Sequence, residues 1–485
     1  MKPTDQDSSP DGAPPGGSVE LPAVQRRTFY FALGAVAAWA AFFVYQWKGG
    51  NLIHLYQGLA ILGLAALPAL LWARRGDGGF PLMEVFMLTG VNTYAIPLLV
   101  GHEGVLVYPD EVITAAANLV LTYQAAALIT YYSIRGRAKT TSFWVEEIVS
   151  ERFSRFLPYG LVATTVYAAA GAFWHDQIFS HLPAETEGIL RAAFFGLGII
   201  CVFILSRHWG LGQLTSQQRA FLLLNLVLQF VIEATSLLLI EGISSVVLAL
   251  LGYISGSRRV PLVAVAAAIT VIAILHNGKS EMRDRYWTDP PRVVTLSDVP
   301  SFYREWITCG LQRADSTRAN KAAKLLDRTS LLQIICLVVD RTPSKQPFLD
   351  GDTYVNIPSQ FVPRFFWPNK PPAHLSTYRL SIYYGLQTEA DTASTTIGFG
   401  TLSEAYANFG FPGAVMLGVI FGFVFKKITV WTRHSPMLSY GGLILVLLLA
   451  WSFQTELTLS IWLSSLFQAC VAVLGIPAVL RHLFN

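Results

Sequence analysis

Charged residues are scarce in this chain of 485 residues. Asp, Glu, Lys and Arg make up 14% of it, whereas 53% of its residues are hydrophobic. A soluble domain carries about 25% charged residues. The shortage excludes an ordinary soluble protein, and a net charge of only +4 gives no argument for binding nucleic acid.

Several motifs that carry chemistry are also missing. The chain has no Walker A phosphate loop, so no ATP-driven step is predicted, and no Gly-X-Ser-X-Gly elbow of a serine hydrolase. Its four cysteines lack the spacing of a metal site, and no His/Cys cluster accompanies them. We therefore expect no metal and no cofactor. The nearest approach to an Asp-X-Asp pair is Asp350-Gly351-Asp352, where the glycine favours a plain turn.

No signal peptide is predicted at the N-terminus, because a basic start followed by an apolar core is absent from residues 1–24. Residues 1–24 are rich in Pro, Gly, Ser and Asp, and almost no large apolar residue precedes Leu21. This composition predicts a disordered cytoplasmic tail.

Long apolar runs fill most of the remaining chain. Runs of about 20 residues have the length that a helix needs to cross a bilayer. They lack the two-residue alternation of a membrane barrel. The sequence predicts an all-α polytopic membrane protein with about twelve transmembrane helices. The expected spans are 28–47, 52–73, 81–100, 111–133, 157–174, 188–206, 219–240, 242–257, 260–276, 402–425, 438–455 and 458–480.

The distribution of Lys and Arg predicts the orientation. With both termini in the cytoplasm, the cytoplasmic segments hold eighteen basic residues, and the short external loops hold only Lys48 and Arg191. The spans then form two groups, 25–276 with spans one to nine and 402–485 with spans ten to twelve. Between them lies one large external loop, 277–401, which holds fifteen basic residues.

This external loop has predicted order of its own. Ser297 to Leu311 and Asp315 to Val339 have the pattern of helices, and the apolar half 331–339 is expected to lie on the membrane or under a lid. Cys309 and Cys336 are both placed outside, where a disulfide can form, although each falls inside a predicted helix. Whether they are joined stays open at this point.

The densest part of the loop is Gln360-Phe361-Val362-Pro363-Arg364-Phe365-Phe366-Trp367-Pro368-Asn369-Lys370-Pro371-Pro372. Four prolines in thirteen residues forbid a regular helix and a central strand. We call residues 360–372 the proline loop. It is expected to be stiff and to hold Arg364 and Lys370 in place.

Further cations in the same interval are Arg283, Arg285 and Arg328. Arginine suits bidentate recognition of phosphate, so several arginines at the outer membrane face would suit a lipid diphosphate. Local ion pairs on a solvated face are the better explanation of any single one. For Arg364, which lies between Pro363 and Phe365, we favour a function.

Two acids in the predicted spans are candidates for proton transfer. Glu233 shares one helix face with Asn225 and Gln229, and an acid at this depth faces either a cavity or a hydrogen-bonding partner on another helix. Glu404 opens the tenth span near the proline loop. Its alternative role is that of an acid favoured by a helix N-terminus.

The interval 280–415, roughly a quarter of the chain, resembles the Wzy-type oligosaccharide repeat-unit polymerases of bacterial O-antigen and exopolysaccharide assembly. The resemblance rests on Arg328 before an apolar helix, Thr342-Pro343, Phe348-Leu349-Asp350-Gly351-Asp352-Thr353-Tyr354, Ile357-Pro358, the run from Val362 to Pro371, and Glu404-Ala405-Tyr406-Ala407-Asn408-Phe409-Gly410 with Pro412-Gly413. The run from Val362 to Pro371 is the most specific part.

The resemblance implies a glycosyltransferase of the bacterial inner membrane that works without a metal at the periplasmic face. A growing glycan on undecaprenyl diphosphate would be the donor, and a lipid-linked repeat unit the acceptor. The five cations would hold the diphosphate, and Glu404, or secondarily Glu233, would be the general base. Trp367, Tyr354 and Tyr406 would stack on sugars, although aromatic residues here can equally anchor the loop at the interface. A chain-length regulator and a flippase of the same pathway are the expected protein partners.

Three other functions compete with this one. A ligase that moves finished glycan to a different acceptor would have the same broad fold. A transporter of polysaccharide or lipid-linked oligosaccharide would show two similar halves with broken helices, and the sequence has no such symmetry. A purely structural role would leave the fixed cations of the proline loop unexplained.

Overall fold

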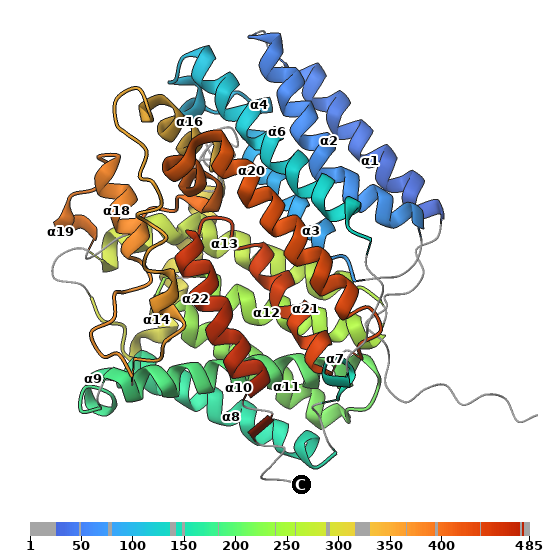
Figure 1. The fold of residues 1–485 in the computed structure, drawn as a ribbon. Coiled ribbons are helices and arrows are strands. Elements are labelled where there is room, and N and C mark those ends of the chain that lie inside the picture. Colours follow the sequence, from blue (N-terminus) through green and yellow to red (C-terminus); the bar gives the residue numbers. More distant parts are fainter. Residues whose placement is uncertain are drawn as a thin grey trace, which may run out of the picture.

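The computed structural model of this chain is all-α, as the sequence predicts. It describes residues 26–47, 50–75, 80–135, 142–147, 151–182, 184–237, 239–257, 259–287, 292–315, 330–364, 366–392, 396–436, 438–475 and 478–479. The N-terminal tail 1–24 and Arg328 therefore lie outside the described residues. Figure 1 shows the arrangement of the helices.

Eight helical segments are long and apolar enough to cross a membrane, which makes the chain a multi-pass membrane protein. They belong to α1 (Arg26–Gln46), α2 (Leu52–Arg75), the run of α3 (Leu82–Gly90), η1 (Val91–Ala95) and α4 (Ile96–Leu99), α6 (Asp110–Ser133), α8 (Glu151–Phe173), α10 (Ala184–Gly210), α13 (Leu262–Tyr286) and α20 (Gly400–Trp431).

Four more helices occupy the other expected spans. They are α11 (Ser216–Ala234), α12 (Leu239–Ser257), α21 (Tyr440–Ser452) and α22 (Leu459–Cys470), the last continued by η3 (Val471–Gly475). With 13 residues, α21 is about 20 Å long at 1.5 Å per residue, less than the roughly 30 Å of a bilayer core. The count of twelve spans stays a prediction.

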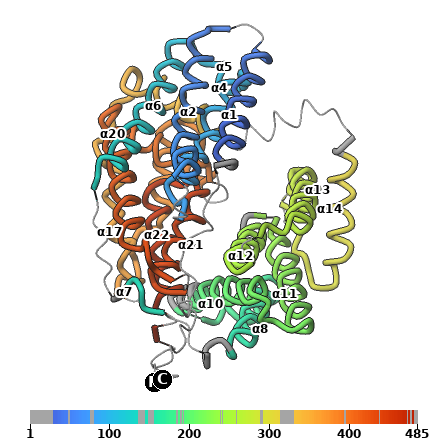
Figure 2. The backbone as a smooth tube through the Cα atoms, turned by 90° about the vertical axis from the view of Figure 1, so that its right-hand side faces the viewer, coloured from blue at the N-terminus to red at the C-terminus, as the bar shows by residue number. Residues whose placement is uncertain are grey.

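The helices form two packing units. One holds α1 to α6 and the C-terminal helices from α16 (Leu332–Arg341) to α22, and the other holds α8 to α14 (Val299–Asp315). The units meet where α10 contacts α22 and η3. Figure 2 shows α13 and α14 on one side of the molecule and α17 (Ile357–Gln360), α20 and α22 on the other.

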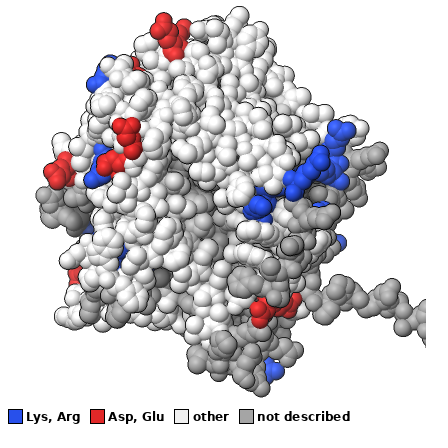
Figure 3. All heavy atoms as spheres, viewed as in Figure 1, with Lys and Arg blue, Asp and Glu red and all other residues white. Residues whose placement is uncertain are grey.

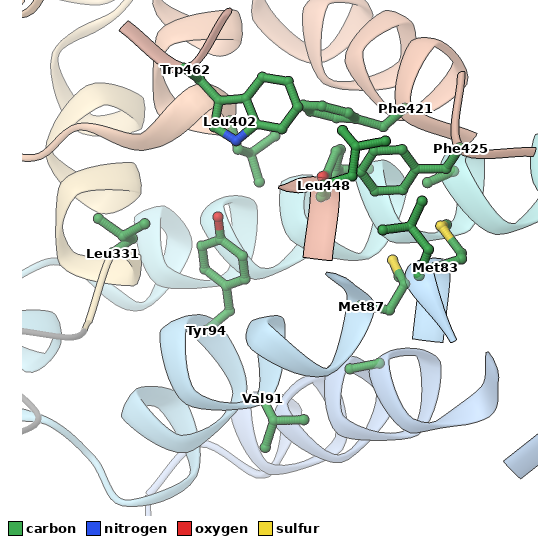
Figure 4. Close-up of a cluster of buried hydrophobic side chains, with 14 of the residues drawn as sticks. Met83, Met87, Val91, Tyr94, Leu331, Leu402, Phe421, Phe425, Leu448 and Trp462 are labelled. Atoms are coloured by element: carbon green, nitrogen blue, oxygen red, sulfur yellow. The ribbon is translucent and has the colours of Figure 1, made fainter. Parts of the chain in front are cut away.

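The core of the first unit is apolar and draws on many helices. Figure 4 shows Met83 and Met87 of α3 beside Phe421 and Phe425 of α20. Leu448 of α21 and Trp462 of α22 complete this core, together with Leu331 from the predicted external loop 277–401. The ring centroids of Phe421 and Trp462 are 5.7 Å apart. Since Leu331 belongs to this core, part of the predicted external loop is built into the bundle.

Close helix contacts depend on glycines four residues apart. A Cβ added to Gly418 of α20 would lie 2.5 Å from the carbonyl oxygen of Tyr123 on α6, and one added to Gly422 would collide with the carbonyl oxygen of Ala127. Small residues at this spacing let two membrane helices approach closely. The rising numbers on both helices show that α6 and α20 run parallel.

The interval 277–401 is divided between the two units. α13 continues as a helix to Tyr286, and the predicted helix around 297–311 is confirmed as α14, which packs on α13. The helices α16, α17, α18 (Leu375–Tyr383) and α19 (Glu389–Thr392) belong to the first unit.

The expectation that 331–339 lies on the membrane or under a lid is wrong. α16 covers this stretch, and its apolar side chains are buried against α6 and α20. The backbone N–H of Leu331 also donates to the carbonyl oxygen of Thr93 in the π-helical turn η1, at 3.1 Å. A loosened helical turn frees such a carbonyl for a partner outside its own helix.

Charge is unevenly distributed over the surface. Figure 3 shows a cluster of Lys and Arg on the right of this face, whereas acidic residues, mixed with a few Lys and Arg, lie on its upper left and an acidic patch lies below. A guanidinium nitrogen of Arg75 lies 3.5 Å from a carboxylate oxygen of Glu84. This unevenness agrees with the charge pattern in the sequence, while the assignment of sides to cytoplasm and periplasm stays a prediction.

Gly418→Leu should destabilise the protein, because the side chain would push α20 away from α6. Overpacking of this kind costs about 1–3 kcal/mol. The measurement is the thermal midpoint of the detergent-solubilised protein, and the matched control is Gly63→Leu on α2, where an added Cβ meets nothing within 4 Å. Equal midpoints for the two variants would contradict the close α6–α20 contact.

Candidate functional site

The proline loop is held in shape by its own cations. Nη1 of Arg364 donates to the carbonyl oxygens of Pro368, at 3.0 Å, and Lys370, at 3.3 Å. Nζ of Lys370 donates to the carbonyl oxygens of Val362, at 2.8 Å, and Gln360, at 3.5 Å. Burial and the charge of Arg364 lower the pKa of the Lys370 ammonium. The two cations predicted from sequence thus lie together.

The ends of the loop are joined and rest on α22. The buried Gln360 donates from Nε2 to the carbonyl oxygen of Pro371, at 3.1 Å. The ring centroids of Phe361 and Phe467 on α22 are 5.2 Å apart. The loop is therefore attached to a helix of the bundle.

The side chain of Glu404 contacts the start of α22. Glu404 belongs to the first part of α20, residues 400–409, which is separated from the second part by a break at Gly410 (φ 62°, ψ −148°). Its side chain is fully buried. Oε2 accepts a hydrogen bond of 2.6 Å from the backbone N–H of Leu459, the first residue of α22. The acid thus satisfies a helix N-terminus, although of another helix than its own.

The other carboxylate oxygen of Glu404, Oε1, is buried and accepts no hydrogen bond within 3.5 Å from the described residues, although the Thr353 hydroxyl lies beside the carboxyl group and stabilises its charged form. A buried oxygen without a donor is costly, so it is a candidate contact for a ligand or a proton. The carboxyl group combines a structural bond on Oε2 with a second oxygen, Oε1, that is less firmly held.

A turn is fastened beside Glu404 by Asn408. Its Oδ1 accepts from the N–H of Gly351, at 3.0 Å, and its Nδ2 donates to Oγ1 of Thr353, at 2.8 Å. The turn predicted at 350–352 is confirmed, with Asp350 and Gly351 at positive φ. Asp352 pairs with Arg379 at 2.6 Å.

The second predicted acid, Glu233, lies in the other unit on α11. Its Oε2 accepts from Oγ of Ser245 on α12, at 3.4 Å. Gln229 on the same face donates to Oγ1 of Thr164 on α8, at 3.1 Å. These contacts are the bonds between helices that stood as the alternative explanation of this polar face.

The predicted cations of α13 are not brought to the proline loop. Nη2 of Arg283 donates to the carbonyl oxygen of Leu237, at 3.1 Å, and its guanidinium lies 4.2 Å from the ring centre of Trp287. Arg285 forms ion pairs with Glu281 and Glu305. Figure 2 shows α13 far from α17, where the proline loop begins. Their role in binding the diphosphate stays a prediction, and in this conformation Arg283 and Arg285 do not lie beside Arg364 and Lys370.

The three predicted sugar-stacking residues differ in exposure. Trp367 is 45% exposed. The ring of Tyr354 stacks on Phe409 with 6.1 Å between centroids, and burial, then the charge of Glu404, raise the pKa of its hydroxyl. Tyr406 is buried, and its hydroxyl donates to the carbonyl oxygen of Thr342, at 3.3 Å. Of the three, Trp367 offers the most open ring.

Sequence reasoning missed Glu456, in the link between α21 and α22. The side chain of Glu456 reaches solvent. The backbone carbonyl oxygen of Glu456 accepts a hydrogen bond of 2.9 Å from the N–H of Gly400. Gly398 also lies close, since a Cβ added to it would be 2.8 Å from the Cβ of Glu456. Desolvation by the surrounding protein raises the pKa of the Glu456 carboxyl, and the positive charge of Lys279 opposes this rise. An acid in so short a link between apolar runs was the available signal.

Cysteines and metal-binding side chains add no further site within the described part of the chain. Cys309 and Cys336 are both buried and both free, one on α14 and the other on α16. The described residues contain no group of three or more His, Cys, Asp or Glu that could hold a metal ion.

Comparison with known proteins gives one match. Residues 215–453 match a family model described as a domain of unknown function, DUF8712. The matched range runs from the N-cap of α11 to the residue after α21 and includes the proline loop and Glu404. No curated protein and no solved structure matches the chain.

Glu404→Gln should fold nearly as well as the native protein, because an amide oxygen can still accept from the N–H of Leu459. Glu404→Leu should be less stable by about 1–3 kcal/mol, the cost of leaving a buried donor without an acceptor. Thermal midpoints of the purified variants measure this difference. If both variants melt like the native protein, the bond from Leu459 does not hold α22.

Proposed function

We propose that the protein is a lipid-diphosphate-dependent glycosyltransferase that polymerises oligosaccharide repeat units. In this proposal a growing glycan on undecaprenyl diphosphate is transferred to a lipid-linked repeat unit at the periplasmic face of a bacterial inner membrane. Both termini would be cytoplasmic. The proposal rests on the resemblance of the interval 280–415 and on the geometry of the proline loop.

The observation that carries the proposal is the way Arg364 is held. All its hydrogen bonds to described residues come from Nη1, which donates to two loop carbonyl oxygens. The side chain is otherwise exposed, so Nε and Nη2 remain as an oriented pair of donors. Such a pair matches two oxygens of a phosphate group. Lys370 beside it adds a second positive charge.

These groups suit the chemistry of the leaving group. The acceptor hydroxyl oxygen would form a bond to the anomeric carbon of the donor sugar while the bond from that carbon to the diphosphate oxygen breaks. Negative charge then develops on the departing undecaprenyl diphosphate. Donors and cations that are already oriented stabilise such charge without reorganising during the reaction.

The hydroxyl proton needs an acceptor, and we propose Glu404. Oε2 is held by the N–H of Leu459, and Oε1 is the oxygen that would take the proton. Because the side chain is fully buried here, the hydroxyl would reach it only after residues that cover it move aside. Glu456, which reaches solvent close to Gly400, is the acid to compare it with.

Arg364→Ala should leave the protein in the membrane but abolish polymer, with lipid-linked single repeat units accumulating. Arg364→Lys should also be poor, because the paired donors are lost. The matched control is Lys345→Ala, which removes an exposed cation that pairs with Asp340 at 2.6 Å. The readout is the chain length of extracted glycan, and long chains in Arg364→Ala would sink the diphosphate role.

Glu404→Gln should block turnover while the protein stays folded and still binds the lipid-linked repeat unit. Glu456→Gln should retain polymer of normal length. The measurement is polymer formation by each purified variant on lipid-linked repeat units. The opposite pattern, with loss only in Glu456→Gln, would move the base to Glu456.

Deletion of the gene separates this function from its rivals. Accumulation of single lipid-linked repeat units indicates a polymerase. Accumulation of long lipid-linked chains indicates a ligase, and unaltered glycan with a lost solute flux indicates a transporter.

A further inference from the structure

The proline loop begins beside the later part of α22, away from the first residue of that helix. Its Phe361 contacts Phe467, eight residues after the first residue of that helix. Eight residues correspond to about 12 Å along a helix axis. Trp462, between these two points, packs on Phe421 of the membrane-spanning helix α20. The start of the loop is therefore level with the apolar interior of the bundle rather than with the tip of the link before α22.

Three of the loop's backbone N–H groups donate within it, and two more donate to the residues just before it. Pro363, Pro368, Pro371 and Pro372 have no N–H group. The N–H groups of Phe366 and Trp367 donate to the carbonyl oxygen of Pro363, and that of Lys370 donates to the carbonyl oxygen of Trp367. The preceding N–H groups of Phe361 and Val362 donate to the carbonyl oxygens of Pro358 and Ser359.

Five of the loop's carbonyl oxygens accept hydrogen bonds from side chains of the loop itself. They are those of Gln360, Val362, Pro368, Lys370 and Pro371, and the donors are the side chains of Gln360, Arg364 and Lys370. In water a loop does not need these bonds, since solvent supplies them. In a bilayer, irregular backbone persists only where its polar groups find partners other than lipid.

Three of the exposed side chains of the loop are large and apolar, beside the exposed polar side chains of Arg364 and Asn369. Phe366 is 74% exposed, Trp367 45% and Phe361 40%. They continue the surface of α22 and η3, where Phe467 and Val471 are also exposed. Large aromatic and apolar side chains gathered next to an apolar helix fit the acyl and interfacial region of a membrane.

We infer that residues 360–372 form a re-entrant element that enters the outer part of the bilayer beside α22, with Phe366 and Trp367 in contact with lipid. Its cations then serve the fold as well as any ligand, because they occupy carbonyl oxygens that water does not reach. The occupant of this apolar surface is membrane lipid. The inference does not depend on the proposed reaction.

Spin labels test where the loop lies. The label is placed at Phe366→Cys in a Cys470→Ala background, in which the other three cysteines are buried. The purified protein is reconstituted in vesicles of phosphatidylethanolamine and phosphatidylglycerol, and collision with oxygen, which is enriched in lipid, is compared with collision with a water-soluble nickel chelate. Val419→Cys, exposed on α20, is the lipid reference, and Lys345→Cys is the water reference.

A Phe366 label in lipid should show a ratio of oxygen to nickel collisions several-fold above that of the Lys345 label and close to that of the Val419 label. A ratio equal to the Lys345 value would overturn the inference. If Phe366→Cys does not fold, Trp367→Cys takes its place with the same two references. Because only this protein is in the vesicles, protection from both probes would point to self-association instead of lipid and would also overturn it.

Lys370→Met gives a second, independent readout. In a membrane-embedded loop it leaves the carbonyl oxygens of Val362 and Gln360 without a donor, so the thermal midpoint in vesicles should fall clearly below that of Lys345→Met. In a water-exposed loop solvent replaces the ammonium, and the two variants should melt alike. Equal midpoints would therefore contradict the re-entrant placement.

Discussion

The hydrogen bond from the backbone N–H of Leu459 to Glu404 is the contact on which the packing of residues 330–401 against the helical bundle depends. It joins the first part of α20 to the start of α22. Asn408, one turn further along α20, then holds the turn at 350–353, and Gly400 binds the carbonyl oxygen of Glu456. Remove this bond and the first turn of α22 loses a partner in an apolar surrounding, where lost bonds are costly.

The same helix carries the proline loop. Phe361 packs on Phe467 of α22, so the loop with its two cations and the acid Glu404 are positioned by opposite parts of one rigid element. In the proposed reaction the cations of the loop would bind the leaving diphosphate, and Glu404 would accept the proton of the attacking hydroxyl. Catalysis by orientation requires that the groups acting on the two reactants are held in fixed positions, and one helix, α22, contacts both of them here.

Much of the fold follows from local pattern. Apolar runs of spanning length predicted the all-α architecture, and the aromatic pattern around 297–311 predicted α14. Asp350-Gly351 predicted a turn, since these residues tolerate positive φ. The assembly of the cations was not predictable in this way. Arg283 and Arg285 share the sequence interval of Arg364, yet α13 carries them into the other packing unit. Glu456 was overlooked because its neighbourhood is formed by Gly398 and Gly400, which are distant in sequence.

The sequence by itself determined the membrane character of the chain, the positions of most helices and the irregular backbone of the described residues of the proline loop. These depend on the composition and spacing of residues that are close in the chain. Only the tertiary structure decided which oxygen of Glu404 is used, where Arg364 directs its donors, and that the apolar stretch 331–339 is buried as α16. Such outcomes depend on which helices come into contact, and every residue offers the same backbone carbonyl oxygen and, except for proline, the same N–H group.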